Sequence, residues 1–176
     1  MQSSIVKAAL AIALTATMVP MGWSQSTSQG MQTQASVLTS REIAKQGADQ
    51  LAAAKKSPTG LSTVTLATYP GHHTMLIARS KSGVAEVHAN YSDFLIVVDG
   101  GGTELTGGTV VNPEEQPDGE TRGLRVDGAT AHILHKGDVI HIPAGMPHQA
   151  IQAPGQTITL FVIKVQAAGT GDETAK

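Results

Sequence analysis

Two stretches of the chain carry residues whose types and spacing could do chemistry. In the first, Glu86 and His88 stand two apart, which on a strand places both side chains on the same face. In the second, His148 follows a corner made by Pro143 and Gly145. Proline fixes φ and glycine tolerates positive φ, so backbone geometry sets the direction of His148. Imidazole and carboxylate groups bind metals or exchange protons, and the absence of cysteine excludes thiolate ligands and thiol nucleophiles.

The second stretch resembles the second conserved motif of the cupin superfamily. That motif is a glycine, five residues and then Pro-x-Gly-x-x-His. The chain matches it at Gly137, Pro143, Gly145 and His148. Gln152 stands where the cupin motif usually has an asparagine.

The first stretch resembles the first cupin motif in an altered form. That motif is His-x-His, three or four residues, a glutamate, six residues and a glycine. Asp93 stands at the glutamate position and Gly100 at the glycine, which places Glu86 and His88 at the histidine pair. One histidine of the motif is thus replaced by a carboxylate. The resemblance covers roughly residues 60 to 165. Within the superfamily, the two stretches look like those of a branch of small secreted bacterial cupins.

The resemblance implies that a jelly-roll barrel brings the two motifs together around one divalent ion. Oxygen and imidazole donors suit Mn, Fe, Zn, Co or Ni. His141, on the strand before the corner, is either a group behind the ligands or a packed strand histidine. The implied ligands are His88, His148, Asp93 and Glu86, with His141 and Gln152 as outer partners.

Glu86 is the residue that separates the alternatives. As a ligand it adds negative charge and favours a harder ion such as Mn. If it is not a ligand, the two histidines and Asp93 approach the facial triad of non-haem iron oxygenases, and Glu86 is free to act as a general base. In a third interpretation the protein binds no metal. The carboxylates are then exposed charges, and His88 is a hydrogen-bonded core histidine.

The elements that must position these residues are short strands. From Leu61 onward, β-like runs alternate with glycine and proline, which is typical of a sandwich or barrel. We predict an all-β fold of the cupin type, a double-stranded β-helix or jelly-roll barrel, with one N-terminal α-helix after a signal peptide. The glycines at 100–102 predict a hairpin, and residues 112–128 predict a surface loop with solvated charges. Strands are expected at 61–68, 74–80, 84–89, 94–98, 102–111, 130–135, 138–142, 148–152 and 157–165.

A helix is predicted ahead of the strands. Thr39 and Glu42 have capping-box spacing, and apolar residues then recur at helical intervals as far as Lys56. Ser57-Pro58 ends the pattern. The apolar face is narrow and rich in alanine, so we expect the helix to pack on the outside of a sheet.

The chain length predicts a single domain preceded by an export signal. Lys7 and the apolar run 8–19 are typical of a secretory signal peptide, and the run is too short to span a bilayer. The expected organisation is a signal peptide at 1–24, a flexible lead at 25–37, the helix at 38–57, the cupin barrel at 58–168 and a disordered tail at 169–176. The mature protein is expected in the periplasm or outside the cell, with no membrane association after processing.

Composition limits the function classes. A net charge of −2 and 3% aromatic residues predict no nucleic-acid surface. Two hypotheses remain. The first is a metal-dependent enzyme acting on a small organic substrate with oxygenase, isomerase or lyase chemistry, as the cupin resemblance implies. The second is a non-catalytic barrel that binds a small ligand such as a sugar or a phenolic. By analogy with single-domain cupins, a homodimer formed through sheet edges is a further expectation.

Overall fold

The computed structural model describes residues 35–168. The predicted signal peptide, most of the predicted lead and the predicted tail lie outside these residues. Within the described part of the chain, no helix is long and apolar enough to cross a membrane.

The predicted helix is present as α1 (Ser40–Lys56) and begins with the expected capping box. The backbone N–H of Glu42 donates to Thr39 Oγ1 at 3.3 Å, and the backbone N–H of Thr39 donates to Glu42 Oε2 at 2.8 Å. Ser57, which precedes Pro58, has an extended backbone and ends the helix. The sequence pattern therefore located both ends of this element.

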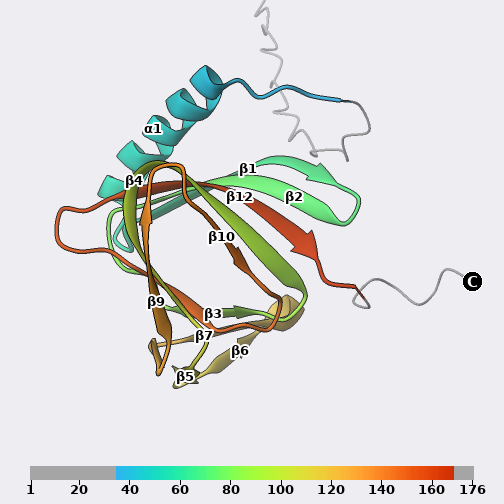
Figure 1. Ribbon diagram of the computed structural model, residues 1–176, viewed down its shortest axis with the longest axis vertical. Helices are drawn as coiled ribbons and strands as arrows, with labels where there is room; N and C mark the ends of the chain where they lie inside the picture. The colour runs from blue at the N-terminus through green and yellow to red at the C-terminus, as the bar shows by residue number, and fades with distance from the viewer. Residues whose placement is uncertain (1–34, 169–176) are drawn as a thin grey trace, which may run out of the picture.

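The rest of the described chain is antiparallel β-structure, which confirms the predicted all-β class with one N-terminal helix. The main sheet has the order β1-β2-β12-β4-β11-β3-β7-β6, and β9 and β10 also pair with β4. This sheet curls so that its two ends face each other (Figure 1). The strands are β1 (Leu61–Tyr69), β2 (His72–Arg79), β3 (Ala85–His88), β4 (Tyr91–Thr106), β5 (Thr109–Val111), β6 (Glu114–Gln116), β7 (Glu120–Gly123), β8 (Arg125–Asp127), β9 (Thr130–His135), β10 (Val139–Ile142), β11 (His148–Ile151) and β12 (Ile158–Gln166).

Strand β4 connects the two halves of the curled sheet. Its first part pairs with β12 and β10, and its second part, from Gly101 to Thr106, pairs with β9 and β11. Gly100 lies at the change of partners with φ +74°, and a Cβ there would collide with the carbonyl oxygen of Thr157. The predicted hairpin at 100–102 is therefore wrong, because these glycines let one strand pass from one half to the other without turning back.

Helix α1 covers the outer face of the half formed by β1, β2 and β12 (Figure 1). Ala54 of the helix and Leu76 and Ala78 of β2 are fully buried. The prediction that the helix packs outside a sheet is confirmed. The opposite faces of the same strands point into the interior, where they meet a cluster that includes Leu95, Val97, Leu134, Ile142, Ile158, Leu160 and Val162.

The segment 112–128 is not the surface loop that its prolines and glycines predicted. It forms β6, a short 3₁₀ turn (Pro117–Gly119), β7 and β8. Strand β7 pairs with β3 in register, with Glu86 opposite Arg122 and His88 opposite Glu120. Turn residues at 117–119 mark only the connection inside a hairpin of β6 and β7, and β7 joins this hairpin to β3 in the main sheet.

The Pro143 corner has the predicted geometry and also contacts the first motif. Gly145 has φ +77°, and its backbone N–H donates to the carbonyl oxygen of His88 at 2.9 Å. The corner thereby holds the end of β3 beside the start of β11. This contact ties the two motifs together through the backbone.

Gly145→Val is expected to destabilise the protein by about 1–2 kcal/mol, because a β-branched residue is strained at positive φ. No atom lies within 4 Å of an added Cβ at this position, so the cost is conformational rather than steric. Pro143→Ala, the matched control, should cost about 0.5–1 kcal/mol through the entropy of the unfolded chain. Urea denaturation curves measure both values. A Gly145→Val protein as stable as the wild type would contradict the role given to this corner.

Candidate metal centre

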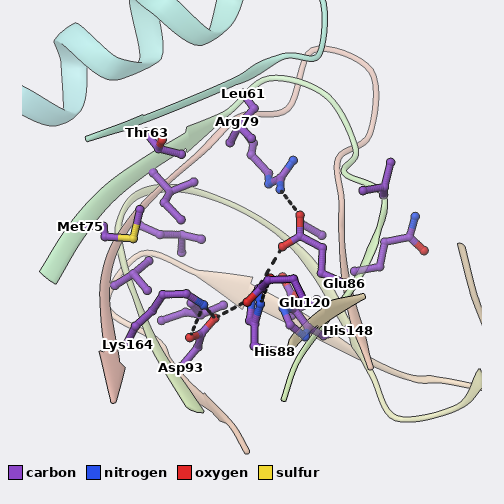
Figure 2. A pocket seen from close by; sticks show the side chains of 18 of the residues that line it. Leu61, Thr63, Met75, Arg79, Glu86, His88, Asp93, Glu120, His148 and Lys164 are labelled. Carbon is purple, nitrogen blue, oxygen red and sulfur yellow. Dashed lines mark hydrogen bonds and ion pairs between the residues drawn. The ribbon is translucent and has the colours of Figure 1, made fainter. Parts of the chain in front are cut away.

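The two halves of the curled sheet enclose a cavity of about 380 Å³. Strands β2, β4 and β12 contribute apolar side chains, including Met75, Leu160 and Val162, and also charged ones. The charged and imidazole side chains of β3, β7 and β11 line the opposite side, and Figure 2 shows the labelled groups of both sides pointing toward one another. The charged and imidazole residues of the lining are Arg79, Glu86, His88, Asp93, Glu104, Glu120, Arg122, His148 and Lys164.

His88 ends β3 and is 7% exposed. Its Nδ1 lies 2.5 Å from Glu120 Oε2. An ionised carboxylate only accepts hydrogen bonds, so Nδ1 carries the proton and Nε2 keeps its lone pair. Nε2 faces the other acidic groups, at 3.4 Å from Asp93 Oδ2 and 3.8 Å from Glu86 Oε2. A carboxylate that fixes the imidazole tautomer in this way is a common partner of metal-binding histidines.

His148 begins β11 and has the same arrangement with a different acceptor. Its Nδ1 lies 3.1 Å from the carbonyl oxygen of Met146. A carbonyl also only accepts, so the proton is on Nδ1 and Nε2 is free. Burial holds the pKa of His148 below its ordinary value, although the Met146 bond acts in the opposite direction. The ring is therefore neutral at pH 7, which is the form that binds metals.

Glu86 lies on β3 directly opposite His148 of β11 on one side and Arg122 of β7 on the other. Its Oε1 accepts from Arg122 Nη1 at 2.5 Å and lies 3.7 Å from Arg79 Nη2, while Oε2 faces His88. Burial raises the pKa of Glu86, but the surrounding groups, Arg122 and Arg79 first and the two imidazoles after them, together outweigh burial and hold it below the usual value. Glu86 is thus an oriented carboxylate with one oxygen directed toward the histidines.

Glu86, His88 and His148 form a group whose ligand atoms all lie within 4.8 Å of one another, one atom from each residue. Such a group could hold a metal ion. The donors come from β3 and β11, which are neighbours in the sheet although about 60 residues separate them in the sequence. Two imidazoles and one carboxylate with further positions open match the donor set of catalytic rather than structural metal sites.

Asp93 lines the same cavity but has a different partner. Lys164 Nζ of β12 lies 2.7 Å from its Oδ1 and 2.9 Å from its Oδ2. Both carboxylate oxygens are therefore occupied by an ammonium group, and the side chain of Asp93 is only 6% exposed. The structure brings three of the four predicted ligands into one group and places Asp93 beside it in an ion pair.

The two predicted outer partners lie elsewhere. His141 is exposed and stacks on Phe94, with ring centroids 4.4 Å apart. It faces outward because it alternates along β10 with Ile142, which is buried. Gln152 is buried against Gly102, and its backbone N–H donates to Ser82 Oγ at 3.0 Å. Neither side chain lines the cavity, and in the described part of the chain neither makes a hydrogen bond to Glu86, His88 or His148, whose partners are Arg122, Glu120 and Met146.

Several lining residues were not among the predicted site residues. Glu120 and Arg122 fall in the segment predicted as a surface loop, where charged side chains are expected to be solvated. Lys164 lies on the same face of β12 as the inward-facing Leu160 and Val162, since the three residues are spaced two apart, and this spacing marks it as inward facing. Arg79 and Glu104 carry no distinguishing motif.

Glu104 is a buried carboxyl group in the second half of β4, and it is 4% exposed. Burial raises the pKa of Glu104 to about 8, although Arg79 acts to lower it. The carboxylates of Glu86 and Asp93 raise it further. Glu104 is therefore mainly protonated at pH 7, unlike Glu86.

Comparisons with known proteins extend the description of the fold. No protein-family model matches the sequence, and no curated protein matches it. Among solved structures, the DMSP lyase DddQ from Ruegeria pomeroyi DSS-3 is 12% identical with a TM-score of 0.46, over 63% of this chain and 49% of that one. A cupin 2 conserved barrel domain protein from Rhodopseudomonas palustris is 17% identical with a TM-score of 0.44, over 61% of each chain.

KdgF from Halomonas sp. is 13% identical with a TM-score of 0.44, over 64% of this chain and 84% of that one. The chain thus spans about half of the lyase and more than four fifths of KdgF. At these identities the similarity concerns the fold alone.

Glu104→Gln is expected to remove a pH-dependent loss of stability in chelator-treated protein. Because the pKa of Glu104 is about 8 in the folded protein and its ordinary value is 4.5, the folded state holds its proton where the unfolded state has lost it. The wild type should therefore lose stability as the pH rises from about 5 to about 8, by roughly 2–4 kcal/mol from this group. Free energies of unfolding at pH 5 and pH 8.5 measure the difference.

The glutamine variant should gain stability relative to wild type over the same interval, because an amide has no proton to lose. Glu114→Gln, at an exposed position of β6, is the control and should follow the wild type. Parallel pH curves for wild type and Glu104→Gln would contradict the protonated state assigned to this carboxyl.

Proposed function

We propose that this cupin-fold protein binds a divalent metal ion through Glu86, His88 and His148 and acts as a metal-dependent enzyme on a small organic molecule. The observation that carries the proposal is that both imidazoles have Nδ1 bound to an acceptor of the protein. Each Nε2 is thereby left for a ligand in the same cavity as Glu86 Oε2. Of the alternatives stated for Glu86, this arrangement supports the one in which Glu86 is a metal ligand.

The proposed set leaves room for a substrate. Three protein donors leave coordination positions open, and the adjoining cavity of about 380 Å³ accepts a small molecule. A bound divalent ion would supply a Lewis acid that polarises a carbonyl or carboxylate oxygen. Two imidazoles and one carboxylate suit Fe as well as Mn, Co, Ni or Zn.

The surrounding charges have defined tasks in this proposal. Glu120 holds the tautomer of His88, and Arg122 orients Glu86 so that only one of its oxygens faces the histidines. Asp93, neutralised by Lys164, adds a buried polar group beside His88 without competing for the ion. Apolar side chains of β2, β4 and β12 reduce the space for water beside these groups.

A second candidate is a barrel that binds a small ligand such as a sugar or a phenolic without metal and without catalysis. The ion pairs favour it, because Arg122 already compensates Glu86 and Lys164 already compensates Asp93. Neither carboxylate needs a metal to be stable in the interior. Metal content of the purified protein distinguishes the two candidates.

Substitution of the proposed ligands should remove the metal. His88→Ala, His148→Ala and Glu86→Gln should each lower bound metal strongly, and the double histidine variant should be little worse than the worse single, because the residues share one ion. Glu120→Gln should weaken binding about 10–100-fold. Asp93→Asn should retain the metal, because Lys164 and not an ion neutralises Asp93. Elemental analysis of protein expressed in metal-supplemented medium measures the occupancy.

His135→Ala is the control, since that side chain is 76% exposed on β9. Chelator should lower the melting temperature of wild type and leave the double histidine variant unchanged. Wild-type protein that carries no ion after metal-replete expression would leave the metal-free barrel as the better function.

We also propose export to the periplasm or the cell exterior, on the basis of the sequence of residues 1–24. The mature chain should begin near Gln25, because Gly22 and Ser24 provide small residues after the apolar run. N-terminal sequencing of protein recovered from a periplasmic extract tests this. An intact Met1 in that fraction would rule out cleavage.

A further inference from the structure

We propose that Arg79 and Glu104 form a carboxylate-binding subsite in the cavity, and that the ligand is a small organic carboxylate with an apolar body. The link to a metal-bound substrate rests on the function proposed above. The subsite itself is argued from side chains that the proposed metal centre does not use.

Arg79 carries hydrogen-bond donors that find no acceptor among residues 35–168. It is the last residue of β2, its side chain is 12% exposed, and it points into the cavity toward Glu86 (Figure 2). Its one ion pair in the described part of the chain is with Glu86 Oε1 at 3.7 Å, which is too long for a hydrogen bond. The same oxygen already accepts from Arg122 at 2.5 Å. A guanidinium offers five N–H donors in a planar fork. Most of the N–H groups of Arg79 therefore make no hydrogen bond within residues 35–168.

The backbone beside Arg79 leaves space for its guanidinium group. A Cβ added at Gly83 would lie 2.7 Å from Arg79 Nη1 and 2.9 Å from its Cζ. Any larger residue at position 83 would displace the guanidinium from its present place. Gly83 is in turn held by Gln149, whose Nε2 donates to its carbonyl oxygen at 2.9 Å. The position of Arg79 is therefore built into the cavity wall.

Glu104 is the complementary group. It lies on β4 between Ala150 of β11 and His132 of β9, and it lines the same cavity as Arg79. Its carboxyl group makes no hydrogen bond and no ion pair with any residue between 35 and 168. A carboxyl group that is 4% exposed and has no cation within bonding distance is stable only as the neutral acid. As an acid it has an O–H to donate and no charge to repel an anion.

The two groups together specify an anion rather than a neutral ligand. Arg79 acts electrostatically on Glu104 more strongly than any other charged group does, yet the two form no ion pair. The guanidinium therefore keeps most of its donors for a ligand, and the carboxylic acid adds another. A planar carboxylate matches the fork of the guanidinium, and a buried site of this kind forms short, charge-assisted hydrogen bonds. Lys164 is different, because Asp93 already occupies it.

The rest of the cavity limits the shape of the carboxylate. Arg79 Nη2 lies 3.7 Å from Oε1 of Glu86, and His88 Nε2 lies 3.8 Å from Oε2 of the same carboxylate. A ligand bound to Arg79 therefore lies next to the proposed metal ligands. Met75 and Ile77, on the same face of β2 as Arg79, and Leu160 of the neighbouring β12 provide an apolar surface beside the guanidinium. A small acid with a hydrocarbon part fits both the guanidinium and this surface. Its second oxygen-bearing group, where it has one, would face His88 and His148.

The test uses butanoate and its uncharged isostere butanamide as probes, titrated by calorimetry into chelator-treated full-length protein. Butanoate should bind and butanamide should bind at least tenfold more weakly. Arg79→Gln should reduce butanoate affinity at least tenfold. Glu104→Leu removes the O–H donor and should also reduce butanoate affinity at least tenfold. Glu104→Gln keeps an N–H donor, so its butanoate affinity should stay within about threefold of wild type.

Arg125→Gln is the matched control, because Arg125 is 52% exposed and pairs with Asp127 away from the cavity lining. Melting temperatures show whether each variant is folded, and the conservative Glu104→Gln variant keeps the test informative if the leucine variant is not. Equal affinities for butanoate and butanamide, or butanoate affinity unchanged in both Arg79→Gln and Glu104→Leu, would overturn the subsite.

Metal content measured on the same variants separates this proposal from the function proposed above. Arg79→Gln should keep its metal, because Arg122 still orients Glu86. Butanoate binding that depends on Arg79, in a protein that never carries metal, would support the subsite and reject the metal centre. Full metal occupancy with no preference for butanoate would support the metal centre and reject the subsite.

Discussion

The site depends on one feature of the sheet, which is the position of β3 between β11 and β7. On one side of β3, Glu86 lies opposite His148, and on the other side it lies opposite Arg122. The same pairing places Glu120 against His88, so a single register supplies the proposed ligand Glu86, the group that orients it and the acceptor that fixes an imidazole tautomer. A shift of one residue would turn these side chains to the outer face. The hydrogen bond from Gly145 to the carbonyl of His88 secures this register from the other motif.

The interior is divided into two parts with different physical roles. Toward one end, aliphatic residues such as Val97, Leu134 and Ile142 pack together and stabilise the barrel through burial. Toward the other, the charged residues line a cavity (Figure 2). Strand β4 contributes to both, because Val97 belongs to the packed part and Asp93 and Glu104 belong to the cavity. The helix on the outer face lets the inner face hold polar groups, since part of the apolar surface is buried against α1 instead.

The charges in the cavity differ in how fully they are compensated. Asp93 has Lys164 on both oxygens, and Glu86 has Arg122 on one oxygen. Glu104 has no such partner among residues 35–168, and Arg79 has only a 3.7 Å contact to the Glu86 carboxylate, which Arg122 already holds. Buried polar groups without partners are costly, so a cavity that keeps them is more readily understood as a binding site than as a structural core. Compensated and uncompensated groups stand side by side, which is why the cavity can be stable when empty and still favour an anionic ligand.

The sequence by itself determined the elements whose signals are local. The capping box at Thr39 and Glu42 predicted the helix, and the Pro143 corner predicted the direction of His148. The alternation of apolar residues after Leu61 predicted the all-β class. Each of these features depends on neighbouring residues. The motif spacing also selected Glu86, His88 and His148, which the fold brings together. It could not show that Lys164 neutralises Asp93 or that residues 120–123 form a strand beside β3. Those facts depend on strand pairings between residues 30 to 70 positions apart, and long-range pairing leaves no local pattern. Only the tertiary structure could decide them.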